Sequence, residues 1–212
     1  LDTPQQDGGQ WDMVVSLFEK YGVVPKSVYP ESISSSDSRE LNQILNKLLR
    51  QDAQILRELA AEGAESAELQ AKKEELLQEV FNFLTMNLGL PPRQFDFSYR
   101  DKDNHFHSES GLTPLTFYQK YVDLKLDDYV SIINAPTADK PYGRSYTVEM
   151  LGNVVGSKPV RYLNVEMNRL KELAIAQMQA GETVWFGSDV GQSSNRKAGV
   201  MAEGMHDFTA SM

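Results

Sequence analysis

The residues with the clearest chemical potential lie near the start of the chain, where Gly8 and Gly9 directly precede Gln10 and Trp11. Glycine has no Cβ, so another chain can approach its backbone closely. Its backbone can also take a positive φ, as a tight turn requires. The simpler interpretation, a glycine turn that starts a core helix, stays open on these residues alone. Asp7 is typical of a residue that caps that helix through its carboxylate, which we favour over a substrate contact.

Histidines offer a second kind of chemistry. His105 and His107 lie two residues apart on an expected strand, so both side chains point to the same side, as metal ligands do. The neighbouring sequence offers no convincing third ligand, and we interpret the pair as exposed residues of a β-hairpin. The run 101–104 resembles the start of a calcium loop, but Phe106 stands where such a loop needs glycine, so we interpret it as a turn. His206 has no nucleophilic partner in the sequence and receives no catalytic role. We predict no metal site and no cofactor.

The glycine pair needs a rigid element behind it, and the next residues supply a helical pattern. Apolar residues recur at spacings of three and four from Trp11 to Tyr21, which predicts one buried face of a helix over 11–21. Gly22 stands where a helix ends in a left-handed residue, and Pro25 follows shortly after.

Two long apolar stripes follow a serine-rich connector that ends at 34–36. Asp37, with Glu40 three residues on, resembles a capping arrangement. The stripes run from Leu41 to Leu59 and from Leu69 to Leu88, separated by a short glycine-containing linker. They predict two helices folded back as an antiparallel hairpin. We favour packing of these stripes within one protomer over a pure subunit contact.

The second half of the chain is a mixture of short strands and helices. Alternating aromatic residues over 94–99, a turn at 101–104 and a return at 105–107 predict a β-hairpin, and Thr113-Pro114 predicts a short helix to about Tyr121. Further strands are expected at 129–134, 146–148 and 160–163, and a helix is expected from about 166 to 180 with Met167, Leu170, Leu173, Ala174 and Met178 buried. Residues 184–186 predict a strand buried on both faces, and the polar residues after Gly187 predict a loop.

Composition narrows the function classes. A chain of 212 residues that is 41% hydrophobic can form one sizeable core, or a core with a satellite element. A net charge of −9 and a pI near 4.9 argue against a nucleic-acid-binding surface. The lack of cysteine excludes disulfides and fits a reducing compartment, and no apolar run approaches the ~20 residues of a membrane span. We therefore expect a cytoplasmic location and no membrane partner.

Longer motifs carry a family resemblance. The run Asp7-Gly-Gly-Gln-Trp11, followed by Tyr21-Gly-Val-Val-Pro25 and Tyr29-Pro30, resembles the segment after the nucleophile helix of papain-like cysteine peptidases. The particular variant is similar to the bleomycin hydrolase and bacterial aminopeptidase C branch, since simple papains carry Asn-Gly-Gly-Tyr or similar. The resemblance extends through 137–143 and 184–191, over essentially the whole chain.

The resemblance implies an α+β architecture: a partial papain-like fold with a long helical-hairpin insertion, a helix-rich N-terminal part and a β-containing C-terminal part. It divides the chain into three segments. Residues 1–36 would belong to the helical (left) domain with the substrate-binding glycine pair, residues 37–92 would form the hairpin insertion, and residues 93–212 would belong to the β-rich (right) domain.

The resemblance also implies a function. The parent enzyme would remove N-terminal residues from peptides by thiolate attack, with a thiolate–imidazolium pair and no metal. Gly8 and Gly9 would bind the main chain of the peptide substrate, and Gln10 and Trp11 would lie near its second pocket. Trp11 suits the buried start of its helix equally well. In this family the helical insertions help to build a hexameric barrel, which implies a homo-oligomer.

The family's catalytic residues are missing from this sequence. Its cysteine and oxyanion glutamine precede the glycine pair, and its histidine and asparagine follow the Trp-Phe-Gly segment; this chain has no cysteine, starts at Leu1 and stops at Met212. We therefore expect an internal piece of an enzyme that is inactive alone. The alternative is a stand-alone, non-catalytic interaction module whose binding surface is the helical hairpin 37–88.

Overall fold

The computed structural model describes residues 4–5, 8–122, 124–188 and 190–202. The chain divides into two compact units: residues 1–131 with 145–163, and residues 132–144 with 164–212. The predicted division into three segments, with boundaries at 36 and 92, follows the domains of the family and is not tested by these two compact units. It stays a prediction.

The first unit begins with helix α1 (Trp11–Tyr21), whose bounds agree with the predicted helix. Val15 and Ser16 are its buried residues. Gly22 ends the helix at a φ of 76° and donates its N–H to the Phe18 carbonyl at 2.9 Å. The next residue, Val23, donates its N–H to the carbonyl of Pro114 at 3.1 Å. The end of α1 is therefore tied to a segment far along the chain.

A four-residue helix, α2 (Ile33–Ser36), occupies part of the predicted connector. The Ser32 hydroxyl accepts a hydrogen bond from the Ser35 N–H at 3.0 Å, and the Ser35 hydroxyl accepts one from the Ser32 N–H at 2.9 Å. This reciprocal pair satisfies backbone donors at the start of a helix. A serine-rich run that suggested only a loop is thus able to nucleate one helical turn.

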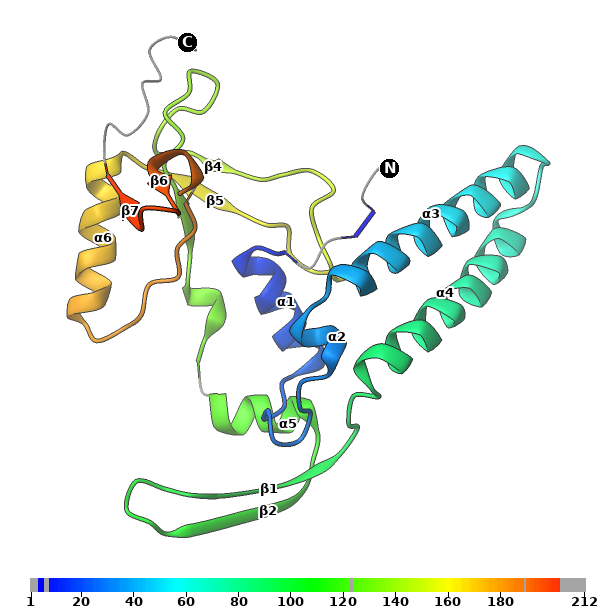
Figure 1. Cartoon of the computed structure of the whole chain (residues 1–212), viewed down its shortest axis with the longest axis horizontal. Helices are drawn as coiled ribbons and strands as arrows, with labels where there is room; N and C mark the ends of the chain where they lie inside the picture. Colours follow the sequence, from blue (N-terminus) through cyan, green and yellow to red (C-terminus); the bar gives the residue numbers. More distant parts are fainter. Residues whose placement is uncertain (1–3, 6–7, 123, 189, 203–212) are drawn as a thin grey trace. The chain divides into compact units, whose positions relative to one another are not determined.

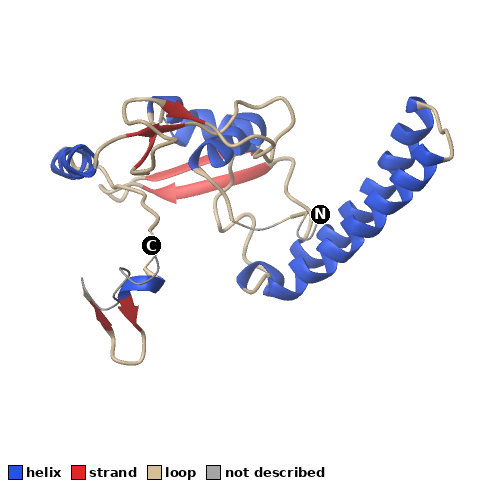
Figure 2. Ribbon diagram, turned by 90° about the horizontal axis from the view of Figure 1, so that it is seen from above, coloured by secondary structure: helices blue, strands red, loops and turns tan. Residues whose placement is uncertain are grey.

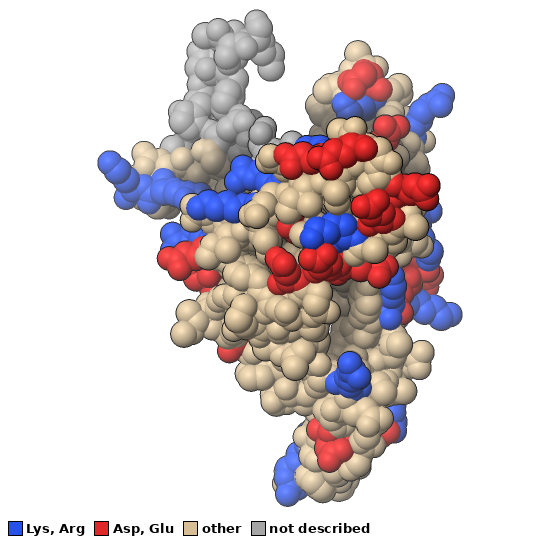
Figure 3. Space-filling model, turned by 90° about the vertical axis from the view of Figure 1, so that its right-hand side faces the viewer, with Lys and Arg blue, Asp and Glu red and all other residues tan. Residues whose placement is uncertain are grey.

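Helices α3 (Arg39–Ala61) and α4 (Ser66–Leu88) form the predicted antiparallel hairpin (Figures 1 and 2). Leu41 and Leu45 of α3 are buried against Val80 of α4, and four half-buried leucines and Phe83 surround them. The two stripes therefore pack against each other, and α2 packs against both helices at the base. The outer faces carry charges of both signs, interleaved as Figure 3 shows; Lys72 pairs with Glu75 at 2.8 Å.

The predicted cap of α3 was wrong. The N-cap residue is Ser38, which makes no side-chain capping bond. The Asp37 carboxylate is held mainly by the guanidinium of Arg39, with Nη2–Oδ2 and Nε–Oδ1 distances of 2.6 and 2.9 Å, while the Arg39 backbone N–H donates to Oδ1 at the longer distance of 3.4 Å. A two-point, charge-assisted contact of this kind outweighs a single bond to a backbone N–H.

The base of the hairpin is fixed by polar contacts. The Tyr29 hydroxyl lies 2.8 Å from the carbonyl oxygen of Leu88 and 3.0 Å from that of Gly89. The Ser34 hydroxyl donates to Oδ1 of Asn87 at 3.1 Å. These contacts use carbonyls that the last turn of α4 cannot satisfy internally.

Replacing Tyr29 with phenylalanine is expected to lower the free energy of unfolding by about 1 kcal/mol, because two carbonyl groups lose their donor while the ring stays in place. Denaturant unfolding measures the change. Tyr21→Phe is the matched control, since Tyr21 is 56% exposed at the end of α1. Equal stability of the two variants would show that the Tyr29 hydroxyl does not secure the hairpin.

The predicted β-hairpin is confirmed as β1 (Phe95–Arg100) paired antiparallel with β2 (Phe106–Leu112), with a register shift between Phe95 and Phe97. Thr113 caps helix α5 (Pro114–Phe117), as predicted, by accepting the Thr116 N–H at 3.1 Å. The helix continues as a π-helical turn over Tyr118–Val122. Aromatic rings of the hairpin and of these turns pack together. The Phe97 and Phe117 rings meet edge to face, with 5.1 Å between their centroids.

The remaining strands of the first unit are shorter than predicted. Strand β4 (Ser145–Tyr146) pairs antiparallel with β5 (Tyr162–Asn164), with Tyr146 opposite Tyr162. The Thr147 hydroxyl donates to the carbonyl of Val160 at 2.6 Å, so a side chain takes the acceptor that a longer ladder would use. A 3-10 turn, Leu126–Asp128, precedes these strands.

The second unit contains helix α6 (Met167–Gln179), and strand β3 (Ser131–Ile133) runs into it. The bounds of α6 agree with the prediction, but its predicted burial is wrong: no residue of α6 is buried. Residues 184–186 form no strand, and Phe186 is 85% exposed. The predicted loop after Gly187 contains a 3-10 turn (Gly191–Ser193) and a small hairpin of β6 (Ser194–Asn195) and β7 (Val200–Met201).

Within the part of the chain that the structure describes, none of the helices combines the length and the apolar character that a membrane crossing requires.

Candidate functional site

The glycine pair lies open on the surface. Gly8 and Gly9 are both exposed. A Cβ built on Gly8 would meet nothing within 4 Å, and one on Gly9 would meet only the Met13 sulfur at 4.0 Å. The backbone at these two positions is therefore accessible to another chain, rather than enclosed in the core of the first unit.

Gln10 connects the glycine pair to α1. Its backbone is extended, at a φ of −112° and a ψ of 163°, and its side chain makes no capping bond. Its carbonyl oxygen accepts the N–H groups of Met13 at 3.1 Å and Val14 at 3.2 Å. The chain thus leaves the glycine pair in an extended conformation and enters the helix at Trp11.

Contacts from the distant segment 153–161 fix the position of α1. The Asp12 carboxylate accepts the backbone N–H of Arg161 at 3.1 Å, and the Asn153 side chain donates to the Met13 carbonyl at 3.4 Å. At the other end of the helix, Lys20 Nζ donates to the Val155 carbonyl at 3.2 Å. These contacts hold the helix that carries the glycine pair. Sequence reasoning missed these contacts, because each of the three involves a backbone group that no residue type marks.

Aromatic residues line the start of α1. The half-buried Trp11 ring lies 5.6 Å from the Tyr129 ring, at an interplanar angle of 56°. Burial, and then the nearby charge of Asp12, raises the pKa of Tyr162. The Tyr162 hydroxyl therefore keeps its proton at neutral pH. The packing fits Trp11 as the start of a core helix, and its contact with a substrate stays a prediction.

Both histidines contact the same carboxylate. Asp101 Oδ2 lies 2.8 Å from His107 Nε2 and 3.5 Å from His105 Nδ1. Its Oδ1 accepts the N–H groups of Asp103 at 3.0 Å and His105 at 2.9 Å. The hydrogen bond from His107, and then that from the His105 backbone, lowers the pKa of Asp101. Asp101 thus closes the turn of the β-hairpin.

Over the described ranges no group of three or more histidine, cysteine, aspartate or glutamate residues could hold a metal ion. Two of the candidate residues from the sequence, Asp7 and His206, lie outside the described residues.

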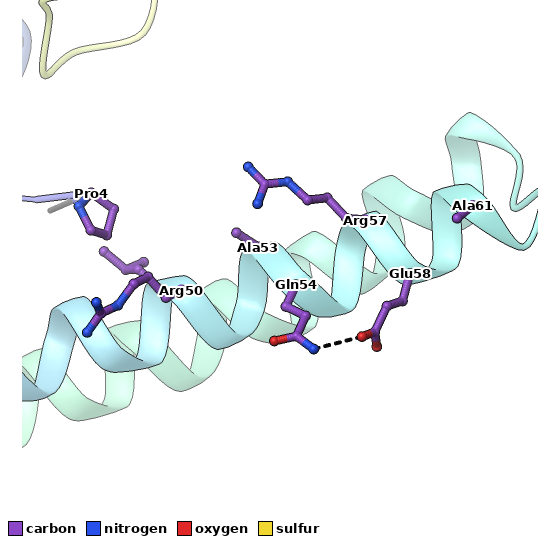
Figure 4. A pocket seen from close by; sticks show the side chains of 8 residues that line it. Pro4, Arg50, Ala53, Gln54, Arg57, Glu58 and Ala61 are labelled. Atoms are coloured by element: carbon purple, nitrogen blue, oxygen red, sulfur yellow. Dashed lines mark hydrogen bonds between the residues drawn. The ribbon is translucent and has the colours of Figure 1, made fainter. Parts of the chain in front are cut away.

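Two hollows lie elsewhere. A groove of about 480 Å³ follows the outer face of α3, where Arg50, Ala53 and Arg57 lie in succession with Pro4 beside them (Figure 4). A shallow hollow of about 580 Å³ is lined by residues of the loop 147–159. Neither is lined by Gly8, Gly9, Gln10 or Trp11, so the candidate site is an open ledge rather than one of these cavities.

Comparison with known proteins adds an independent observation. All residues, 1–212, match the model of the Peptidase C1-like family. Aminopeptidase C of Streptococcus thermophilus is 76% identical over 212 residues, which are 100% of this chain and 48% of that protein. Aminopeptidase C of Listeria monocytogenes is 55% identical over 201 residues, which are 95% of this chain and 45% of that protein.

A solved structure is also similar. The crystal structure of PepW from Lactobacillus rhamnosis HN001 matches with a TM-score of 0.88 and 61% identity, covering 91% of this chain and 43% of that one. The chain therefore spans about half the length of the curated relatives that it matches.

Proposed function

Because the chain belongs to the Peptidase C1-like family and has an α+β, partial papain-like fold, we propose that it is part of a cysteine aminopeptidase. The complete enzyme removes N-terminal residues from peptides by attack of a cysteine thiolate on the peptide carbonyl, with an imidazolium as its partner. Both groups come from residues outside this chain, which contains no cysteine. Seven of its relatives carry the name aminopeptidase C, which supports this activity.

The observation that carries the proposal is the exposed backbone at Gly8 and Gly9, backed by a helix that Asp12, Met13 and Lys20 hold in place. In the proposal, the main-chain groups of the two glycines hydrogen-bond an extended substrate, in the manner of an added strand. A fixed ledge holds the scissile bond in register with the thiolate, and small displacements there cost rate. Gln10 and Trp11 flank the adjoining substrate residue.

Valine at position 8 or 9, introduced into the complete enzyme, is expected to lower kcat/KM about 10- to 100-fold, because the new side chain occupies the space of the substrate main chain. The unfolding free energy is expected to change by less than about 0.5 kcal/mol, since both positions are exposed. Hydrolysis of an aminoacyl-4-nitroanilide and thermal unfolding provide the two readouts.

Gly152→Val is the matched control, because Gly152 is exposed, a Cβ there also meets nothing within 4 Å, and this glycine is not one of the two ledge residues. The ledge is refuted if the Gly8, Gly9 and Gly152 variants have the same kcat/KM. The 212-residue chain alone is expected to release no product, and thiol-dependent turnover by the purified chain would contradict the assignment of the nucleophile.

Two further properties belong to the same proposal. The complete enzyme is cytoplasmic, and it is a homo-oligomer. Size-exclusion chromatography with light scattering measures the mass of the assembly and so tests the second property. The alternative of a stand-alone helical module has less support, because the family match covers the hairpin together with the rest of the chain.

A further inference from the structure

The seam of the helical hairpin contains a carboxylate. Leu41, Leu45 and Leu48 of α3 face α4, and continuing the same spacing by four residues leads to Asp52. Positions spaced alternately by four and three face the partner helix in a two-helix pair, where apolar residues are the rule. Asp52 is only 8% exposed, so it lies in this seam rather than on the surface.

The Asp52 carboxylate has an unfavourable environment when ionised. Burial, and then the negative charge of Glu79 on α4, raises its pKa, and no cation or hydrogen-bond donor among the described residues acts in the opposite direction. The helices packed against α3 are α4, which contributes Glu79, and α2, whose residues Ile33–Ser36 carry no titratable group. A buried carboxylate without a partner is costly when charged.

Asp52 also separates two parts of the hairpin with different packing. The core cluster of Leu41, Leu45 and Val80, with its surrounding apolar side chains, lies between Asp52 and the base. Toward the tip, the seam leucines and isoleucine are only half-buried: Ile55, Leu56, Leu59 and Leu69. A segment with fewer buried apolar contacts opens at a lower free-energy cost than the rest of its domain.

We propose that Asp52 is a pH-dependent latch for the distal hairpin, residues 53–75. With the carboxyl group protonated, this segment stays closed on its partner helix. With the carboxylate ionised, the segment opens locally so that the charge reaches water, while the base of the hairpin stays packed. This device is separate from peptide hydrolysis and concerns a part of the chain remote in sequence from the glycine ledge.

The direction follows from proton linkage. The closed state binds the proton more tightly than the open state, in which Asp52 has its ordinary pKa of about 3.9. The closed state therefore loses relative stability as the pH rises from that value to the raised pKa. Above the raised pKa the loss is complete and does not grow further.

Hydrogen exchange of the 212-residue chain tests the latch. The measured quantity is a ratio of protection factors, corrected for intrinsic exchange rates, at pH 3 and at pH 7. It compares the protection of residues 53–60 and 66–75 with that of residues 41–48 in the same sample. We expect this ratio to fall about tenfold at pH 7, because the closed state loses relative stability once Asp52 is ionised. In Asp52→Asn, which mimics the neutral carboxyl group, the ratio is expected to stay at its pH 3 value.

Glu68→Gln is the matched control, because Glu68 is an exposed acid on α4, and it is expected to keep the tenfold change. Asp52→Leu completes the apolar seam and is expected to abolish the change as Asp52→Asn does, which guards against an effect peculiar to the amide. A ratio independent of pH in the unmodified chain, or a tenfold change that persists in both Asp52 variants, overturns the proposal.

Discussion

Replacing Gly22 with alanine is expected to lower the free energy of unfolding by about 4 kcal/mol or more, a loss in the exceptional range for a single substitution. Gly22 has a φ of 76°, where a Cβ is strained. A Cβ at this position would also lie 2.2 Å from both the carbonyl carbon and the oxygen of Pro114, and 2.4 Å from the nitrogen of Leu115. These are backbone atoms, so relief requires α1 and α5 to move apart and the Val23–Pro114 hydrogen bond to break.

Chemical denaturation followed by circular dichroism measures the loss. Gly63→Ala separates the two causes, because Gly63 has a φ of 92° but open space around its Cβ position. Strain alone predicts a cost of about 1–2 kcal/mol at Gly63. If both variants lose the same stability, the close approach of Gly22 to Pro114 contributes nothing.

Gly22 shows which features could be predicted from the sequence and which could not. The spacing from Trp11 to Tyr21 and the position of Gly22 were sufficient to predict α1 and its end, because both depend on neighbours in the chain. The approach of Pro114 was beyond sequence reasoning, since no residue type marks a backbone contact between distant segments. The helical hairpin was predictable for the same reason as α1: each stripe buries its face on the other, so the pattern contains its own partner.

The predicted burial was wrong where the apolar spacing of a segment does not identify the surface that would cover it. The spacing of Leu170, Leu173 and Met178 identified a helix, yet none of these side chains is buried in the structure. Phe186 likewise belongs to an apolar run and is 85% exposed. Periodicity reports which side chains favour burial, whereas exposure depends on which surface covers them. At Asp37, a nearby guanidinium competed with the expected cap, a preference that propensity alone does not rank.

The candidate site was found through resemblance more than through residue chemistry. The backbone groups of Gly8 and Gly9 leave no side-chain signature, and only the longer motif around them suggested a peptide ledge. The structure adds their exposure and the contact of Asp12 with the Arg161 backbone. The histidine pair had a clearer residue pattern, and its interpretation as exposed residues of the β-hairpin agrees with the structure, where Asp101 contacts both rings.

In the second unit, Asn164 is a residue whose surroundings leave little room for substitution, as Gly22 is in the first unit. Its side chain is fully buried, at 0% exposure. Oδ1 accepts the Ala135 N–H at 2.9 Å, and Nδ2 donates to the carbonyls of Ala135 at 3.0 Å and Lys140 at 2.6 Å. Its backbone N–H donates to Arg144 at 3.0 Å, and its carbonyl accepts the Gly143 N–H at 2.8 Å. One residue thus holds both ends of the loop 135–143.

Asn164→Asp is expected to lower the free energy of unfolding by about 3 kcal/mol at pH 7, because a carboxylate of nearly the same shape places negative charge against two carbonyl oxygens that have lost their donor. Burial and these carbonyls favour the neutral acid, so the folded-state pKa of the new carboxyl group lies above its unfolded value. The loss therefore shrinks as the pH falls through that raised pKa, where the protonated group regains one donor.

Denaturant unfolding at pH 7 and pH 4 measures both effects. Asn82→Asp, an exposed change of equal charge on α4, is expected to cost less than about 0.5 kcal/mol. A loss at Asn164 that is the same at both pH values would mean that volume and packing, rather than the pattern of donors, make this amide necessary.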